Sequence, residues 1–183
     1  MQKIEGGVTA AKGFEAAAAA AGIKYQDRTD MALIYSEKPC KVAGTFTTNV
    51  VKAAPVKWDR NVVDSGMKSQ AVIVNSGIAN ACTGEEGMSY CKETAKEAAK
   101  VLGVDARSVL VGSTGVIGMQ LPMDRVKEGI RKLADVKKPD LESGTQAAQA
   151  TMTTDTKKKE VAVTVEIGDV TVTIGGMAKG SGM

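Results

Sequence analysis

The chain has 183 residues, of which 43% are hydrophobic and only 3% aromatic, so a core would consist mainly of aliphatic side chains. The formal net charge is +3, with acidic and basic residues interspersed, which excludes the concentrated basic face of a nucleic-acid-binding protein. Because histidine is absent, this chain alone cannot contain a Ser-His-Asp triad, a Cys-His pair or a histidine-ligated zinc.

Cysteine usage and hydropathy predict a cytoplasmic chain with no membrane contact. An odd number of cysteines without a CxxC pair indicates a reducing compartment; they are Cys40, Cys82 and Cys91. No apolar run reaches the roughly 20 residues that a membrane span needs. The alanine-rich stretch 16–21 does not have the order of a signal peptide, because Glu5 and Glu15 precede it.

The first half of the chain is predicted to contain several strands. Residues 30–37 and 42–49 read as strands separated by a turn at Lys38-Pro39. Residues 51–59 are predicted to be an extended connection, because Pro55 disfavours helix in the residue before it. The apolar run at 70–77 is predicted to be a buried strand that ends in an Asn-Ser-Gly loop.

The part of the chain after residue 84 is predicted to contain three helices. Apolar residues recur every three or four positions over 85–102, before the natural stop at Gly103. A second strand enters the loop 111–118, and a second helix is predicted over 123–135, after Pro122. A third helix is expected at about 140–150. Strand, loop and helix thus occur twice, which predicts an α+β domain with a layered mixed sheet and helices 85–102 and 123–135 covering a face.

The last element is a predicted β-hairpin over 160–175, with Gly168-Asp169 as its two-residue turn. The expected register places Ile167 opposite Val170 and Val163 opposite Ile174. All the alternating apolar residues then share one face, which we expect to be buried in a core sheet. The hairpin would hold the root of the final segment, "GGMAKGSGM".

Three loops carry candidate functional residues. The loop 74–84, "VNSGIANACTG", is either part of a site, with Ser76 and Asn80 lining it, or an ordinary turn. The loop 111–118, "VGSTGVIG", could cradle a phosphate, hold an oxyanion or simply connect a strand to a helix. The segment 151–156, "TMTTDT", is either part of a site or a polar approach to the following strand.

These stretches occur in an order that resembles the ornithine acetyltransferase family, also called bifunctional glutamate N-acetyltransferase, an arginine-biosynthesis family. The segments that carry the resemblance are "DMALIYSEKPCKVAGTFTTNVVKAAPV", "VNSGIANACTG", "GSTGVIG", "ATMTTDT" and "GGMAKGSGM". The similarity runs from near residue 5 to the end of the chain.

The resemblance implies that residues 1–183 form a single α-chain domain, incomplete without a second chain. Members of the family cut their own precursor just before a threonine that follows the "KGSGM" segment. The downstream β chain begins with this nucleophilic threonine and is expected to complete the sheet of the α chain. An N-terminal threonine carries its own base in its α-amine, which agrees with the absence of histidine.

By motif match, Thr114 and Gly115 correspond to the catalytic oxyanion hole of the family. Thr153 and Lys179 correspond to substrate-binding positions, and an ammonium suits a substrate carboxylate. The implied reaction is ping-pong acetyl transfer from N-acetylornithine to glutamate, with no metal or cofactor; acetyl-CoA is an additional donor in some members. The implied assembly is an α2β2 heterotetramer.

Two other hypotheses stay open from the residues alone. The loop 111–118 could make the chain a noncatalytic phosphate- or nucleotide-binding domain if it lies at a helix N-terminus. Alternatively, the chain could be a purely structural subunit whose C-terminal end docks a partner.

Overall fold

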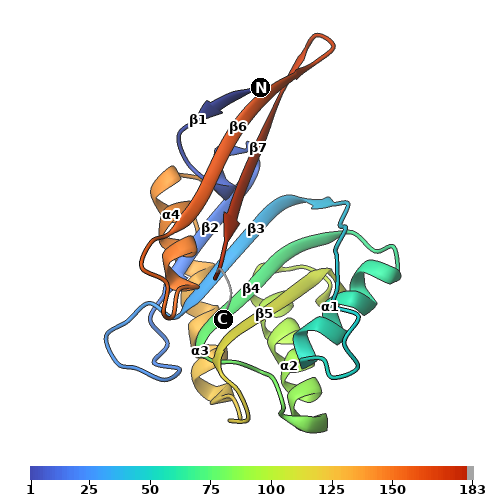
Figure 1. The fold of residues 1–183 in the computed structure, drawn as a ribbon, viewed down its shortest axis with the longest axis vertical. Coiled ribbons are helices and arrows are strands. Elements are labelled where there is room, and N and C mark those ends of the chain that lie inside the picture. The colour runs from blue at the N-terminus through green and yellow to red at the C-terminus, as the bar shows by residue number, and fades with distance from the viewer. Residues whose placement is uncertain (181–183) are drawn as a thin grey trace.

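A four-stranded sheet forms the centre of the computed structural model, which describes residues 1–180 (Figure 1). The strand order is β2-β3-β4-β5, and the strands are β2 Phe14–Ala19, β3 Met31–Cys40, β4 Ser69–Ile78 and β5 Val109–Val116. The pairs β2-β3 and β3-β4 are antiparallel, whereas β4 and β5 are parallel. The α+β fold predicted from the sequence is confirmed.

Helices cover both faces of this sheet. The helices on one face are α1 Ala54–Asp64, α2 Gly84–Leu102 and α3 Met123–Val136, while α4 Leu141–Ala150 lies over β2 and β3 on the other face. Successive side chains of β2 point to opposite faces of the sheet, so the strand contributes to the packing on both sides. Ala17 faces the larger apolar cluster under α1, α2 and α3, and Ala16 faces α4. Two short 3-10 helices, Val8–Ala10 and Ala106–Ser108, complete the connections in this part of the chain.

The three helices expected from periodicity are confirmed. Most of the predicted inward residues of α2 and α3 are at most 1% exposed; they are Cys91, Ala95, Ala98, Val126, Ile130 and Leu133. The other two predicted residues, Met88 and Leu102, are partly buried and pack against the same core. Gly103 adopts a left-handed conformation and ends α2, as expected. Within residues 1–180, no helix is long and apolar enough to cross a membrane.

The prediction of an extended connection over 51–59 is wrong, because α1 begins at Ala54. Pro55 lies in the first turn of this helix, where its missing N–H has no intrahelical acceptor to lose. The helix is joined to β5 by two side chains: the Trp58 indole donates to the carbonyl of Val109 at 3.0 Å, and Asp59 accepts from the N–H of Val111 at 2.9 Å. Helix α1 therefore protects the edge strand of the sheet.

The predicted strand at 42–49 is also absent, and the turn expected at Lys38-Pro39 lies inside the end of β3. Strand β3 continues to Cys40 through a register shift against β4 between Tyr35 and Cys40. Residues 42–49 are largely exposed and pair with no strand among residues 1–180, so their β-propensity alone does not make them a strand. Strand β2, by contrast, was not predicted, because its alanines lack the β-branched pattern of a typical strand.

The hairpin consists of β6 Lys159–Ile167 and β7 Val170–Ala178, and its predicted register is confirmed, with Ile167 opposite Val170 and Val163 opposite Ile174. Its placement in the core sheet was wrong. It pairs with β1 Gln2–Ile4 in a separate three-stranded sheet, ordered β1-β6-β7, that projects from the body (Figure 1).

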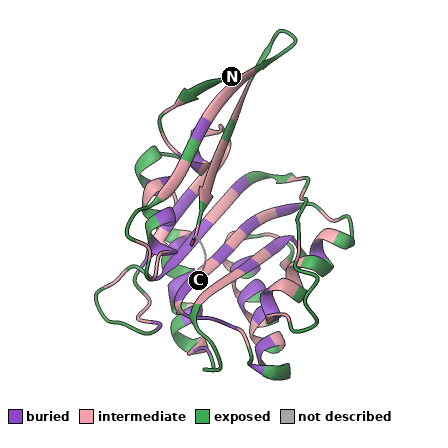
Figure 2. Cartoon of the chain, viewed as in Figure 1, coloured by how far each residue is buried: buried purple, intermediate pink, exposed green. Residues whose placement is uncertain are grey.

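The expected burial of the apolar face of the hairpin is also wrong for this chain. Several of these side chains are 50–62% exposed; they are Val161, Ile167, Val170 and Ile174. Figure 2 shows that most of the hairpin is exposed or intermediate. Ala162 is 0% exposed, and the alternation of side chains along a strand places it on the opposite face. Strand β7 nevertheless returns to the body and places Lys179 beside the end of β4 and β5, so the predicted root of the final segment is confirmed.

Candidate functional site

The candidate site lies where the two parallel strands end. Residues 76–78 of β4 pair with residues 114–116 of β5, which places Gly77 beside Gly115. Both glycines have positive φ angles, +106° and +133° respectively. A Cβ atom on Gly115 would lie 2.3 Å from the carbonyl carbon and oxygen of Gly77. Only glycine fits this close approach of the two backbones, and parallel strands commonly carry ligands at their carboxyl ends.

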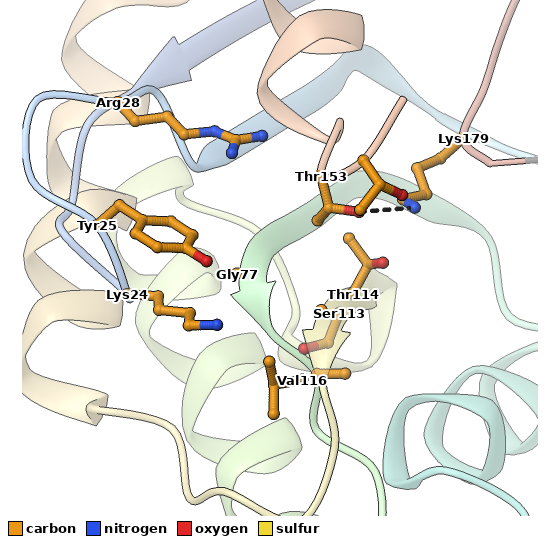
Figure 3. A pocket seen from close by; sticks show the side chains of 12 residues that line it. Lys24, Tyr25, Arg28, Gly77, Ser113, Thr114, Val116, Thr153 and Lys179 are labelled. Atoms are coloured by element: carbon orange, nitrogen blue, oxygen red, sulfur yellow. Dashed lines mark hydrogen bonds between the residues drawn. The ribbon is translucent and has the colours of Figure 1, made fainter. Parts of the chain in front are cut away.

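A cavity of about 510 Å³ opens at this point (Figure 3). It contains all four residues predicted from the sequence, Thr114, Gly115, Thr153 and Lys179, although they come from three distant segments. The remaining lining residues are Lys24, Tyr25, Arg28, Gly77, Ala79, Ser113, Val116 and Thr154. The size suits a small metabolite.

Thr114 lies in Figure 3 between Ser113 and the pair formed by Thr153 and Lys179. The hydroxyl of Ser113 holds the neighbouring loop, because it accepts from the N–H of Asn80 at 2.8 Å and donates to the carbonyl of Ile78 at 3.2 Å. Within residues 1–180, no hydrogen bond engages the side chain of Thr114, which leaves its hydroxyl available to a ligand.

Lys179 is held on the opposite wall from the loop that carries Lys24 (Figure 3). Its ammonium donates to the hydroxyl of Thr153 at 3.1 Å and lies 3.4 Å from a carboxylate oxygen of Asp155. Its side chain is 24% exposed, so the ammonium is partly screened from water. Thr153 and Lys179 therefore form one polar unit that can hold a carboxylate.

Asp155, which the sequence did not single out, organises this unit. Its side chain is 4% exposed and accepts from the ammonium of Lys159 at 2.9 Å, from the N–H of Gly180 at 2.9 Å and from the N–H of Thr153 at 3.3 Å. The Lys159 ammonium and the backbone N–H of Thr153 hold the pKa of the Asp155 carboxyl well below its usual range. The fixed negative charge joins the segment 151–156 to the end of β7.

The loop between β2 and β3 supplies three lining residues that sequence reasoning missed: Lys24, Tyr25 and Arg28. They were missed because β2 was not recognised, so this loop was not placed at a sheet edge. The signal that could have found them is the presence of a lysine, a tyrosine and an arginine in a short turn directly before the first predicted strand.

Ser76 and Asn80, by contrast, do not line the cavity. Both are 1% exposed. Ser76 donates to the carbonyl of Ala150 at 2.7 Å, which ties β4 to α4. Asn80 donates to the carbonyl of Gly87 at 2.9 Å and accepts from Thr83 at 2.6 Å. The expectation that these two residues line a site is therefore wrong, and the ordinary-turn alternative does not describe Ser76 either, because this residue lies within β4. Their neighbours Gly77 and Ala79 reach the cavity.

The geometry does not favour the phosphate-cradle hypothesis for the loop 111–118. Strand β5 runs through Val116, and α3 begins only at Met123. The N–H of Gly118 donates to the carbonyl of Ala81 at 2.9 Å instead of pointing to a ligand. The loop therefore lacks the helix N-terminus that a phosphate site of this kind uses.

Comparison with known proteins finds one matching family and relatives that are similar to this chain over nearly its whole length. A model of the ArgJ family matches residues 15–183. The "Arginine biosynthesis bifunctional protein ArgJ" of Symbiobacterium thermophilum is 54% identical, over 100% of this chain and 45% of the relative, and that of Gloeobacter violaceus is 50% identical, over 98% of this chain and 44% of the relative. The chain thus spans less than half the length of these relatives.

Two crystal structures have the same fold. The arginine biosynthesis bifunctional protein argJ of Bacillus halodurans superposes with a TM-score of 0.93 at 42% identity, covering 99% of this chain and 94% of that chain. The ornithine acetyltransferase of Mycobacterium tuberculosis, solved as a complex with ornithine, gives a TM-score of 0.91 at 46% identity, covering 97% and 93%.

Proposed function

Because the chain belongs to the ArgJ family, we propose that it is the α chain of an acetyltransferase of arginine biosynthesis that moves acetyl from N-acetylornithine to glutamate. The observation that carries this proposal is the convergence of Thr114, Gly115, Thr153 and Lys179 on one cavity. The two relatives are more than twice as long as this chain, which agrees with a β chain encoded after it.

In this proposal the nucleophile is the N-terminal threonine of the β chain. Its α-amine takes the hydroxyl proton, and its oxygen attacks the acetyl carbonyl of N-acetylornithine. The hydroxyl of Thr114 and the N–H of Gly115 stabilise the negative charge that develops on the carbonyl oxygen. The C–N bond then breaks, ornithine leaves with a proton, and the acetyl group stays on the threonine oxygen as an ester.

The second half-reaction returns the threonine to its free form. The free amine of glutamate attacks the acetyl ester while the same oxyanion donors act again. The C–O bond of the ester then breaks, the α-amine of the threonine passes the proton lost by the glutamate amine to the threonine oxygen, and N-acetylglutamate leaves. Thr153 and Lys179 hold the α-carboxylate that donor and acceptor share, while Asp155 keeps the Lys179 ammonium in position. In this scheme no metal or cofactor takes part, acetyl-CoA is an optional second donor, and two αβ units form the α2β2 assembly.

The test uses the full-length precursor. Mass spectrometry of the purified protein should find two fragments, and the cleaved protein should transfer acetyl from N-acetylornithine to glutamate. Thr114→Ala should lower kcat about 100- to 1,000-fold, the usual effect of losing one oxyanion donor. Thr114→Ser keeps the hydroxyl and is the matched control.

Two results would contradict the proposal. Full activity of Thr114→Ala would remove the proposed oxyanion donor, and acetyl transfer by residues 1–183 without a second chain would remove the β-chain nucleophile. Analytical ultracentrifugation of the cleaved protein tests the α2β2 stoichiometry independently.

A further inference from the structure

The loop between β2 and β3 is anchored on the body at several points. The buried carboxylate of Asp30 accepts from the N–H of Ala21 at 2.8 Å and from the N–H of Ile23 at 2.6 Å. The side chain of Ile23 is 2% exposed. Further along, the guanidinium of Arg28 donates to the carbonyl of Met152, next to the Thr153 segment. The loop is therefore held at both of its ends beside the cavity.

Lys24 follows the anchored Ile23, and its backbone and Cβ lie against Gly77 near the end of β4. A Cβ atom on Gly77 would lie 3.0 Å from the Cβ of Lys24, so the stem of this lysine packs on the glycine pair of the site. In Figure 3 the ammonium of Lys24 extends into the cavity from the wall opposite Thr153 and Lys179. The cavity thus has an ammonium group on each of two facing walls.

The charges of these two lysines are compensated differently. Lys179 lies 3.4 Å from the carboxylate of Asp155. Among residues 1–180, no carboxylate forms an ion pair with Lys24, whose ammonium lies 5.0 Å from the centre of the Tyr25 ring. None of the described lining residues is acidic. The wall formed by Lys24 is therefore the positive end of the cavity.

The two amino acids of the proposed reaction differ at the end of their side chains. Both present an α-carboxylate, but ornithine ends in an amine that is protonated at neutral pH, whereas glutamate ends in a second carboxylate. A lysine that lacks a carboxylate partner attracts the side-chain carboxylate of glutamate and repels the ammonium of ornithine. The hydroxyl of Tyr25, which points toward Gly77 in Figure 3, can donate to the same carboxylate.

We propose that Lys24 is the specificity-determining residue for the dicarboxylic acceptor, binding its side-chain carboxylate while Thr153 and Lys179 hold the α-carboxylate. This inference rests on the proposed function. It assigns the recognition of glutamate to the β2–β3 loop of this chain. The ammonium end of ornithine then requires an acidic group outside the described lining of this cavity.

The experiment separates the two half-reactions in the cleaved full-length enzyme. Ornithine release from N-acetylornithine alone reports the first half, and the dependence of the overall rate on glutamate concentration reports the second. Lys24→Met should raise the KM for glutamate about 10- to 100-fold, as expected for a lost charge-assisted hydrogen bond. The burst of ornithine release should not weaken, because Lys24 makes no attractive contact with the ammonium end of ornithine. Lys24→Arg should restore most of the glutamate affinity.

Two further variants complete the design. Lys92→Met removes an exposed lysine of α2 that does not line the cavity and should leave both half-reactions unchanged. Lys24→Glu reverses the charge, so it should weaken glutamate further and accelerate the exchange of labelled ornithine into N-acetylornithine.

The possible failures are distinguishable. If the wild-type enzyme releases no ornithine from N-acetylornithine, the proposed function itself fails, and this inference fails with it. If the wild type is active and Lys24→Met leaves the KM for glutamate unchanged, only the inference is overturned. An equal rise in both KM values would also overturn it, because Lys24 would then bind the part that the two substrates share.

Discussion

In the four-stranded sheet, helices cover the apolar side chains of the strands, whereas on the apolar face of the β6–β7 hairpin several side chains are 50–62% exposed. Leu33 and Ile73 of the first sheet are 0% and 1% exposed, while Ile174 of the second is 55% exposed. Strands β3 and β4 of the first sheet and the hairpin of the second are all rich in apolar residues. The comparison teaches that a period of two identifies which residues share a face but does not say what covers that face.

The largest difference between the two regions should appear when the same side chain is shortened in each. Ile73→Ala should lower the free energy of unfolding by about 2–5 kcal/mol, because it leaves a cavity between sheet and helices. Ile174→Ala should change it by less than about 0.5 kcal/mol in residues 1–183 alone, as for other exposed positions. Denaturant unfolding of both variants measures this.

Measuring Ile73→Ala and Ile174→Ala in the cleaved full-length protein as well tests whether the β chain removes the difference between the two sheets. If the β chain covers the hairpin, the cost of Ile174→Ala should rise toward that of Ile73→Ala. Equal costs in residues 1–183 alone would contradict the contrast between the two sheets.

Glycines with positive φ provide a second matched pair. Gly115→Ala should cost about 3 kcal/mol, because the new Cβ meets the backbone of Gly77 at 2.3 Å and the φ of +133° is unfavourable for alanine. At the hairpin tip, Gly168 has a φ of +61° and no heavy atom within 4 Å of an added Cβ, so Gly168→Ala should cost only about 1 kcal/mol. Similar melting temperatures for the two variants would contradict this prediction.

A third prediction concerns pH. Burial raises the pKa of Asp59, on α1, to about 6 from the ordinary 3.8. Below pH 3.8 the carboxyl is protonated in both the folded and unfolded states; between pH 3.8 and 6 only the folded state keeps the proton, so stability falls as pH rises. Above pH 6 the full penalty applies, and Asp59→Asn should then stabilise the protein by about 1–3 kcal/mol.

The control is the same comparison at pH 3.5, where Asp59→Asn and the wild type should have nearly equal free energies of unfolding. Asparagine keeps an oxygen that can accept from the N–H of Val111, so the contact between α1 and β5 is retained. A gain that does not change with pH would show that the charge of Asp59 is not its cause.

The smallest effects are expected for ion pairs. Lys137 contacts Glu15 with a side chain 26% exposed, and its ammonium lies 4.8 Å from the centre of the Tyr35 ring, so Lys137→Ala should cost about 1–2 kcal/mol. Lys158 lies 2.6 Å from Glu160 in the hairpin but is 41% exposed. Lys158→Ala should cost less than about 0.5 kcal/mol. High salt should reduce the difference, which unfolding curves at two ionic strengths would measure.

Much of the local structure could be predicted from the sequence, and the misses have identifiable causes. Helices α2 and α3 were predicted because each has a long apolar stripe that agrees with a single period. Helix α1 was missed because Pro55 was read as a helix breaker although it lies in the first turn. The strand expected at 42–49 has the right residue types but no partner, and pairing is a property of two segments.

The candidate site was predicted in part. Thr114, Gly115, Thr153 and Lys179 were found through a resemblance of ordered motifs, and they line one cavity. Their proposed roles stay predictions until the variants are measured. Asp155 was not found, because its contacts join the end of β7 to a segment more than twenty residues earlier. The segment 181–183, part of the motif that carries Lys179, lies outside the described residues.

The sequence by itself determined the elements that depend on neighbours along the chain: the stripes of two helices, the register of the hairpin and the absence of a histidine base. Only the tertiary structure decided that the face of the hairpin stays open, that α1 closes the edge of β5, and that Lys24 faces Lys179 across the cavity. The reason is physical: periodicity and turn chemistry act over a few residues, whereas burial and charge compensation depend on which distant segments meet.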